Sequence, residues 1–242
     1  MSGVLVYTDF EAKRNKFAVD IFKKELDIKL VNEGYRGEAE FVINRTNDYK
    51  IAEFYENRGV RVFNPSALSK LANDTQKCYE FMSKNDIEIM PINYMGVPVV
   101  KKKIDGKGGN EVFMLEKAET FEKSYVYQKP CDTPGRDLRV WVIGKEIITS
   151  VLRHNDTDFR SNYCLGGKAT LYTLSDDEKK LTKKIIALLK SDYIGIDFIF
   201  NNGRLIFNEI EDTVGARMVY DLTDIDIISK YCNYIKREIY YE

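Results

Sequence analysis

The sequence contains few residues suited to histidine- or cysteine-based chemistry. Its 242 residues include one histidine, His154, and four cysteines, none of which forms a C-x-x-C pair. A zinc site with two or more histidines is therefore excluded, and so is a proton relay between two imidazoles. Scattered cysteines of this kind are typical of reduced thiols rather than of a disulfide framework.

Net charge and long apolar runs are also lacking. The 37 Lys and Arg nearly balance the 38 Asp and Glu, which leaves a formal charge of -1. The composition therefore gives no reason to expect a nucleic-acid partner. No stretch approaches the roughly 18 consecutive apolar residues that span a membrane, and Asp9 follows the start too closely for a signal peptide. We expect a cytoplasmic protein without nucleic-acid or membrane partners.

Strand-like and helix-like segments alternate at the start of the chain. Helical spacing of apolar residues indicates helices near 17–26 and 52–55. Short apolar runs indicate strands at 4–7, 28–31, 41–43 and 60–63. This alternation predicts a small parallel α/β unit, and Pro65 marks the best candidate for a linker at its end.

The pattern changes after residue 66. Helices are indicated from Asn73 or Asp74 to Lys84, from the Ser175 capping box onward, and from about 224 to 240. The remaining apolar runs indicate strands, at 97–102, 111–115, 137–143, 146–152, 194–200 and 205–210. Short turns such as Gly144-Lys145 separate several of them, so we expect antiparallel hairpins. The whole chain is then α/β, and α+β in part.

A basic, glycine-rich loop follows the strand-like run at 97–102. Lys101, Lys102 and Lys103 lead into residues 105–110, which include Gly106 and two further glycines. Glycines allow the backbone to approach a phosphate, and lysines supply positive potential. The spacing of a Walker A motif is absent. A plain hairpin turn with basic flanks therefore remains an alternative at this point.

Three carboxylates lie on two strand-like segments near the end of the chain. Glu209 and Glu211 share a face of one segment because they are two residues apart, and Asp197 lies on the other. A two-residue hairpin loop would pair position 197 with 208 and send Asp197 to the opposite face. A three-residue loop would pair 197 with 207 and gather all three carboxylates. Gathered carboxylates suit Mg²⁺, and a solvated acidic sheet face is the alternative.

Arginines form a third group of candidates. Arg139 lies on the strand-like segment that begins near Asp137, Arg153 lies on the adjoining one, and Arg160 follows in a polar loop. The guanidinium group binds carboxylates and phosphates bidentately. Each arginine taken alone is better explained as a surface ion pair. Together with the basic loop and the carboxylates, the arginines indicate a nucleotide–metal site.

The segment from about Asp74 to Ile235 resembles an ATP-grasp domain, closest to the RimK-like amino-acid ligases that include ribosomal-protein glutamate ligases. The order and spacing of several short motifs carry this resemblance. They are Lys77 ahead of Pro91, the run from Pro98 to Lys102 with Gly106 and Gly109, Val126 to Pro130, Asp137-Leu138-Arg139, Asp158 to Asn162 with Leu165-Gly166-Gly167, Gly195-Ile196-Asp197, and Asn208 to Glu211.

The resemblance implies a fold and a set of site residues. The fold would be an ATP-grasp domain over 67–242, divided into a lysine and flexible-loop subdomain (67–130) and a metal-binding subdomain (131–242), after a pre-ATP-grasp α/β domain over 1–66. Nucleotide contacts are implied for Lys77, Lys102, Gly106, Gly109, Gln128, Lys129, Pro130, Asp137, Arg160, Ser161 and Asn162. Asp197, Glu209 and Glu211 would bind metal, Arg153, Arg139 and Asn162 would be catalytic, and Arg217 would bind substrate.

The implied reaction is ATP-dependent ligation of a carboxylate to an amine through an acylphosphate, with Mg²⁺ or Mn²⁺. Amino acids or peptides are the implied substrates, and a protein C-terminus, a carrier protein and a homo-oligomer are possible partners. Glu211 stands where the family usually has Asn, and Lys129-Pro130 departs from its usual hinge. A nucleotide-binding regulatory or scaffold protein that has lost ligase activity therefore remains the alternative.

Overall fold

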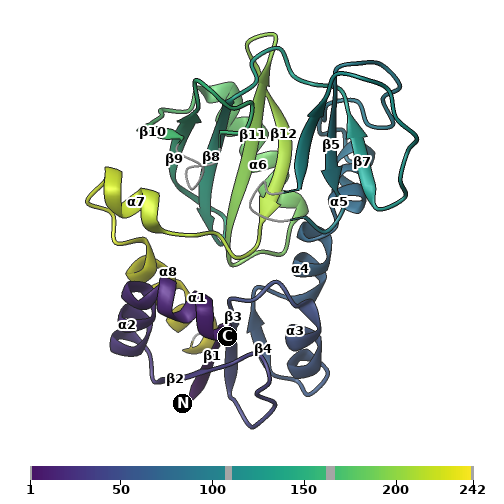
Figure 1. The fold of residues 1–242 in the computed structure, drawn as a ribbon. Coiled ribbons are helices and arrows are strands. Elements are labelled where there is room, and N and C mark those ends of the chain that lie inside the picture. Colours follow the sequence, from purple (N-terminus) through teal and green to yellow (C-terminus); the bar gives the residue numbers. More distant parts are fainter. Residues whose placement is uncertain (1, 107–110, 162–166, 241–242) are drawn as a thin grey trace.

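The N-terminal part of this computed structural model forms a four-stranded parallel sheet with helices on both sides (Figure 1). The structure describes residues 2–106, 111–161 and 167–240. The sheet order is β2-β1-β3-β4. Its elements and their helices are β1 (Gly3–Val6), α1 (Asp9–Arg14), α2 (Lys16–Glu25), β2 (Ile28–Val31), β3 (Phe41–Asn44), α3 (Tyr49–Glu56), β4 (Arg61–Phe63) and α4 (Ser66–Ala72).

The hydrophobic pattern accounts for this N-terminal sheet. Every residue of β1 and β3 is buried, as expected for parallel strands covered on both faces. Helix α2 buries Val19 and Phe22 against the sheet. The last helix, α8 (Ile227–Tyr240), returns to pack against α2 and joins the same core. The domain boundary that we placed at residue 66 remains a prediction.

A three-stranded antiparallel sheet follows, with strand order β6-β5-β7. Its strands are β5 (Val99–Lys103), β6 (Val112–Leu115) and β7 (Tyr125–Gln128), and α5 (Thr75–Lys84) precedes them. Asp74 caps α5, because its carboxylate accepts a hydrogen bond from the Lys77 amide at 3.0 Å. The expected helix, strands and hairpin geometry of this region are confirmed.

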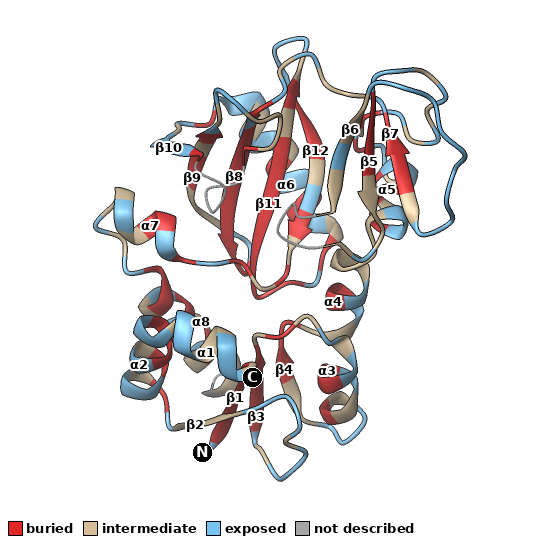
Figure 2. Ribbon diagram, viewed as in Figure 1, coloured by how far each residue is buried: buried red, intermediate tan, exposed pale blue. Residues whose placement is uncertain are grey.

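The largest sheet has five antiparallel strands in the order β10-β9-β8-β11-β12. They are β8 (Arg136–Ile143), β9 (Glu146–His154), β10 (Lys168–Leu171), β11 (Tyr193–Asn201) and β12 (Arg204–Glu211), with α6 (Asp176–Leu188) and α7 (Arg217–Leu222) in the connections. Strands β8 and β11 are buried along nearly their whole length (Figure 2). Ser175 and Glu178 form the expected capping box of α6.

A β-bulge in the β11–β12 hairpin determines which side chains share a face. The loop has two residues, Asn202 and Gly203, with φ angles of 50° and 70°, which suits a tight hairpin turn. Phe198 therefore pairs with Phe207, but the register shifts and Asp197 pairs with Glu209. Asn208 is the extra residue. The three-residue loop that we considered is absent, and the bulge gathers the carboxylates instead.

Asn64, just after β4, ties the N-terminal sheet to the five-stranded sheet. Its side-chain nitrogen donates to the carbonyls of Tyr193 and Asp212, both at 2.8 Å. Its side-chain oxygen accepts from the amides of Asp192 and Tyr193 at 2.6 and 3.1 Å. Four hydrogen bonds satisfy this buried amide fully. Asn64, at the start of the segment expected to be a linker, is therefore buried between the two sheets.

No helix within the described ranges is both long and apolar enough to cross a membrane. The mixed α/β architecture agrees with the fold class inferred from the sequence.

Candidate functional site

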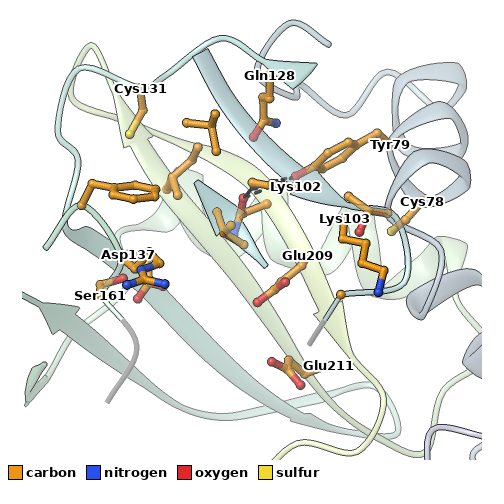
Figure 3. A pocket seen from close by; sticks show the side chains of 18 of the residues that line it. Cys78, Tyr79, Lys102, Lys103, Gln128, Cys131, Asp137, Ser161, Glu209 and Glu211 are labelled. Carbon is orange, nitrogen blue, oxygen red and sulfur yellow. Dashed lines mark hydrogen bonds between the residues drawn. The ribbon is translucent and has the colours of Figure 1, made fainter. Parts of the chain in front are cut away.

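One pocket lies between the three-stranded sheet and the five-stranded sheet (Figure 3). Strand β5 contributes Lys102 and Lys103, α5 contributes Tyr79, and β12 contributes Glu209 and Glu211. The glycine-rich loop reaches it through Gly106. The pocket therefore has lysines on one wall and carboxylates on the other, which is the charge distribution that an anionic ligand with a cation requires.

The three carboxylates predicted to bind metal lie together. One oxygen atom from each of Asp197, Glu209 and Glu211 lies within 4.8 Å of the other two. Glu209 and Glu211 line the pocket, and Asp197 lies behind them, fully buried on β11. Hard oxygen donors in this arrangement match Mg²⁺ or Mn²⁺. The donor set thus fits the metal ion implied by the sequence.

Two buried arginines connect these carboxylates to Asp137. Arg139 binds both oxygens of Asp197 at 2.7 and 2.6 Å and reaches Glu211 at 2.8 Å. Arg153 binds both oxygens of Asp137 at 2.6 Å and reaches Asp197 at 2.6 Å. Negative and positive groups alternate from Asp137 to Glu211. The two arginines therefore compensate part of the charge that the carboxylates concentrate here.

Asp197 and Glu209 have opposite pKa shifts. Burial alone would raise the pKa of Asp197, but the guanidinium groups of Arg139 and Arg153 outweigh it and hold that pKa well below its usual range. The Glu209 side chain is exposed where it faces the pocket, although protein surrounds its other sides, and it forms no arginine pair among the described residues. Desolvation and repulsion from Glu211 and Asp197 raise its pKa to about 8. Glu209 is thus the carboxylate with most to gain from a bound cation.

Lys102 points from β5 toward β12. Its Nζ donates to Oδ1 of Asn208 at 2.7 Å and to the hydroxyl of Tyr79 at 2.9 Å. Both partners are uncharged, so the ammonium keeps its full charge in the pocket. Figure 3 shows Lys102 and Tyr79 converging from β5 and α5. The structure therefore places Lys102 where it can meet an anionic ligand.

The segment from Gln128 to Pro130, predicted to contact the nucleotide, forms another part of the wall. Gln128, Lys129 and Pro130 all line the pocket. Gln128 is 2% exposed, and its Nε2 has no hydrogen-bond partner among the described residues. The amide of Lys129 donates to the carbonyl of Pro91 at 2.8 Å. A buried donor without a partner is costly, so a ligand acceptor at Gln128 would satisfy it.

The polar loop after β9 closes one side of the pocket. Arg160 and Ser161 of this loop line it, next to Asp137 on β8. Arg160 is paired with Asp158 at 2.7 Å, and that pairing raises the pKa of Arg160. Gly109 and Asn162, which we expected at the nucleotide, lie outside the described residues.

Lys77, whose nucleotide role stays a prediction, does not line the pocket. The inward face of α5 carries Cys78, Tyr79 and Met82, all buried, so the helical phase turns Lys77 outward. Its Nζ lies 2.5 Å from Oδ2 of Asp74, and the side chain is 64% exposed. The structure does not bring Lys77 to the pocket. Thr75, two residues earlier, lines the pocket instead.

Lys101, which precedes the basic loop in the sequence, does not line the pocket. It lies on the face of β5 opposite to Lys102, where it is 8% exposed. Its Nζ lies 2.6 Å from Glu119 and 2.5 Å from Glu122. Hydrogen bonds to these two carboxylates raise the pKa of Lys101. Its charge is therefore used to hold the following loop and not to bind the pocket ligand.

Arg217 lies apart from this pocket, at the first position of α7, and is exposed. It makes no ion pair with any residue that the structure describes. Nearby, the carbonyl of Gly215 accepts a hydrogen bond from the Trp141 indole at 3.0 Å, which fixes the segment leading into α7. The substrate role of Arg217 therefore stays a prediction, and no ion pair with a described residue accounts for this arginine.

Tyr79 and Asn208 are among the polar residues of the site that were not predicted from the sequence. Tyr79 lies one helical turn after Thr75, so a helical projection of α5 would have placed both on one face. Asn208 precedes a metal-ligand candidate, but only the bulge turns it toward Lys102. Turn spacing alone could not reveal it.

Comparison with known proteins agrees with this geometry. A family model described as the RimK-like ATP-grasp domain matches residues 66–235. MG011 of Mycoplasma genitalium is 27% identical over 270 residues, covering 96% of this chain and 93% of that protein. A probable alpha-L-glutamate ligase of Haemophilus influenzae is 25% identical over 211 residues, covering 77% of this chain and 71% of the relative.

The solved structure of the ATP-grasp ligase PsnB with a minimal precursor, Mg and ADP has a TM-score of 0.72. It is 14% identical, and the match covers 98% of this chain and 96% of PsnB, so it confirms the expected fold. The family as a whole uses ATP and Mg²⁺. The chain therefore belongs to the RimK-like ATP-grasp family of ATP-dependent carboxylate–amine ligases.

Proposed function

We propose that ATP binds in the pocket between the three-stranded and five-stranded sheets and activates the carboxylate of an amino acid or a peptide. The observation that carries this proposal is the juxtaposition of Lys102 with the Asp197, Glu209 and Glu211 cluster across one pocket. Gln128, Lys129 and Pro130 would surround the adenine, and Gly106, Arg160 and Ser161 would lie near the phosphates. Gly109 and Asn162 keep their predicted nucleotide roles.

The reaction has two balanced steps. A substrate carboxylate oxygen attacks the γ-phosphorus, the bond from that phosphorus to the β,γ-bridging oxygen breaks, and ADP leaves. An amine nitrogen then attacks the acylphosphate carbon, the carbon–oxygen bond to phosphate breaks, and the amine loses a proton. Positioning and electrostatics dominate such phosphoryl transfer, so no enzyme nucleophile is needed. A chain with one histidine can therefore perform it.

Asp197, Glu209 and Glu211 would hold Mg²⁺, or Mn²⁺, beside the phosphates. A bound ion of this kind neutralises charge on the phosphate oxygens. Glu211 replaces the neutral ligand usual in the family, and Arg139 contacts it at 2.8 Å. Arg139 thereby offsets the extra negative charge, which supports Glu211 as a working ligand rather than a sign of lost activity.

Arg139 and Arg153 would assist the reaction without contacting the nucleotide, because both are buried beneath the surface of the pocket. Both are at least nine-tenths buried, and each uses its Nε and Nη2 atoms on carboxylates. We propose that they set the orientation of Asp137 and Asp197 and add positive potential where the γ-phosphate is transferred. Asn162 would assist as the third catalytic group.

The amino-acid or peptide class of substrate is supported by the name of the Haemophilus influenzae relative, which makes L-glutamate the first compound to test. Arg217, exposed at the start of α7, would bind a substrate carboxylate. A protein C-terminus or a carrier protein could supply the other reactant. A homo-oligomer is compatible with these roles.

Substrate-stimulated release of ADP and phosphate tests this function. We expect Mg²⁺-dependent release to rise at least about tenfold above the basal rate when L-glutamate or other amino acids and short peptides are supplied in pairs, because the acylphosphate forms only with a carboxylate present. Tight ATP binding without stimulation by any pair would instead favour the regulatory or scaffold alternative.

A further inference from the structure

Lys102 is held by two neutral groups from outside its own sheet. Asn208 belongs to β12 and Tyr79 to α5, and the Tyr79 hydroxyl in turn donates to Oδ1 of Asn208 at 3.5 Å. The three side chains thus form a closed set of hydrogen bonds that joins three elements around the pocket. Neither partner carries a charge that would compete with an anionic ligand for the ammonium.

The number of N–H donors on the Lys102 ammonium group shows how many remain for a ligand. A lysine ammonium has three N–H donors. Asn208 and Tyr79 accept two of them, which leaves one donor with a defined orientation. A free lysine side chain loses much rotamer entropy when a ligand fixes it, and fixing it beforehand removes that cost from binding.

Both partners of Lys102 are themselves held firmly. Tyr79 is 1% exposed, and its ring packs edge-on against Phe207 with centroids 6.4 Å apart. Asn208 is the extra residue of the bulge, and the residues of β12 before and after it pair with β11. Bulges next to functional sites commonly re-aim a side chain. Here the same bulge gathers the carboxylates and turns Asn208 to Lys102.

We propose that Tyr79 and Asn208 are positioning residues that aim the third N–H of Lys102 at a non-reacting phosphate of the bound nucleotide. This inference rests on the proposed function, in which Lys102 contacts ATP. Because a non-reacting phosphate is bound equally in the ground state and the transition state, loss of the positioning affects KM for ATP and leaves kcat nearly unchanged.

The test is Tyr79→Phe, which removes the hydroxyl and keeps the buried ring. We expect the Kd for the non-hydrolysable analogue AMP-PNP with Mg²⁺, measured by calorimetry, and KM for ATP to rise about fivefold, the scale of one typical lost hydrogen bond. Melting temperature and kcat should change little. The matched control is Tyr127→Phe, whose hydroxyl donates to Glu119 at 2.8 Å and makes no contact with Lys102. Unchanged or tighter AMP-PNP binding in Tyr79→Phe would overturn the inference.

A double-mutant cycle with Lys102→Ala separates the inference from the function on which it rests. We expect Lys102→Ala to weaken AMP-PNP binding, and Tyr79→Phe to have no further effect in that background. If Lys102→Ala binds normally, the nucleotide role of Lys102 fails. If Lys102→Ala binds weakly but Tyr79→Phe adds its full effect, Tyr79 acts independently, and only the positioning role is overturned.

Discussion

Replacing Glu209 by Gln should lower Mg²⁺-dependent, substrate-stimulated ATP turnover by about 100- to 1,000-fold. A catalytic metal contributes several kcal/mol to transition-state stabilisation, and about 1.4 kcal/mol corresponds to a factor of ten in rate. The amide keeps the shape of the side chain but loses the charge that binds the ion. Steady-state release of ADP, together with Mn²⁺ binding measured by electron paramagnetic resonance, checks both parts of the prediction.

The same variant should remain fully folded. Glu209 forms no arginine pair within the described structure, and desolvation together with repulsion from Glu211 and Asp197 raises its pKa. Removing that charge relieves repulsion, so the free energy of unfolding should stay the same or rise. Glu88→Gln is the control, since Glu88 is 56% exposed and pairs with Arg204 on the surface. Turnover by Glu209→Gln within threefold of this control would show that Glu209 is not a metal ligand.

Replacing Arg153 by Met should reduce the free energy of unfolding by about 3–5 kcal/mol, the usual cost of breaking a buried ion pair from one side. Arg153 is 3% exposed and compensates Asp137 and Asp197, which are 8% and 0% exposed. Without it, Asp137 loses its arginine partner, and Asp197 keeps only Arg139, which also contacts Glu211. Urea unfolding at neutral pH measures the loss.

Two further variants make the Arg153 prediction specific. Arg153→Lys keeps the charge but loses the bidentate geometry, so it should fall between the wild type and Arg153→Met. Arg204→Met removes an exposed arginine whose surface pair is worth at most about 1 kcal/mol. An Arg153→Met loss no larger than that of Arg204→Met would show that the alternating charges do not stabilise the fold.

The sequence allowed the architecture to be predicted more fully than the site. Apolar periodicity and capping residues identified the main strands and helices, because burial and local hydrogen bonds act through neighbouring residues. The β11–β12 hairpin shows the limit. Its Asn202-Gly203 turn can be recognised from the sequence. A two-residue turn without a bulge, however, would place Asp197 on the face opposite to Glu209 and Glu211. The bulge at Asn208 depends on pairing with residues on both strands and has no local signature.

The lysines show a second limit. Lys102 lines the pocket as expected, whereas its neighbour Lys101 points to the opposite face and holds Glu119 and Glu122. Strand alternation predicts this opposition once the strand is known. Lys77 lies outside the pocket for the analogous reason in a helix, because motif matching fixed its place in the chain but not its phase on α5.

Formation of an acylphosphate can be tested by following transfer of oxygen from the substrate to phosphate. The active carboxylate substrate, labelled with ¹⁸O in its carboxyl group, would be turned over with unlabelled ATP, Mg²⁺ and the amine in unlabelled water. We expect one ¹⁸O atom in each phosphate released, because the acylphosphate bridge oxygen comes from the substrate and leaves with phosphorus. Phosphate without ¹⁸O would rule out the acylphosphate, because it would mean that water or another group accepts the γ-phosphoryl group.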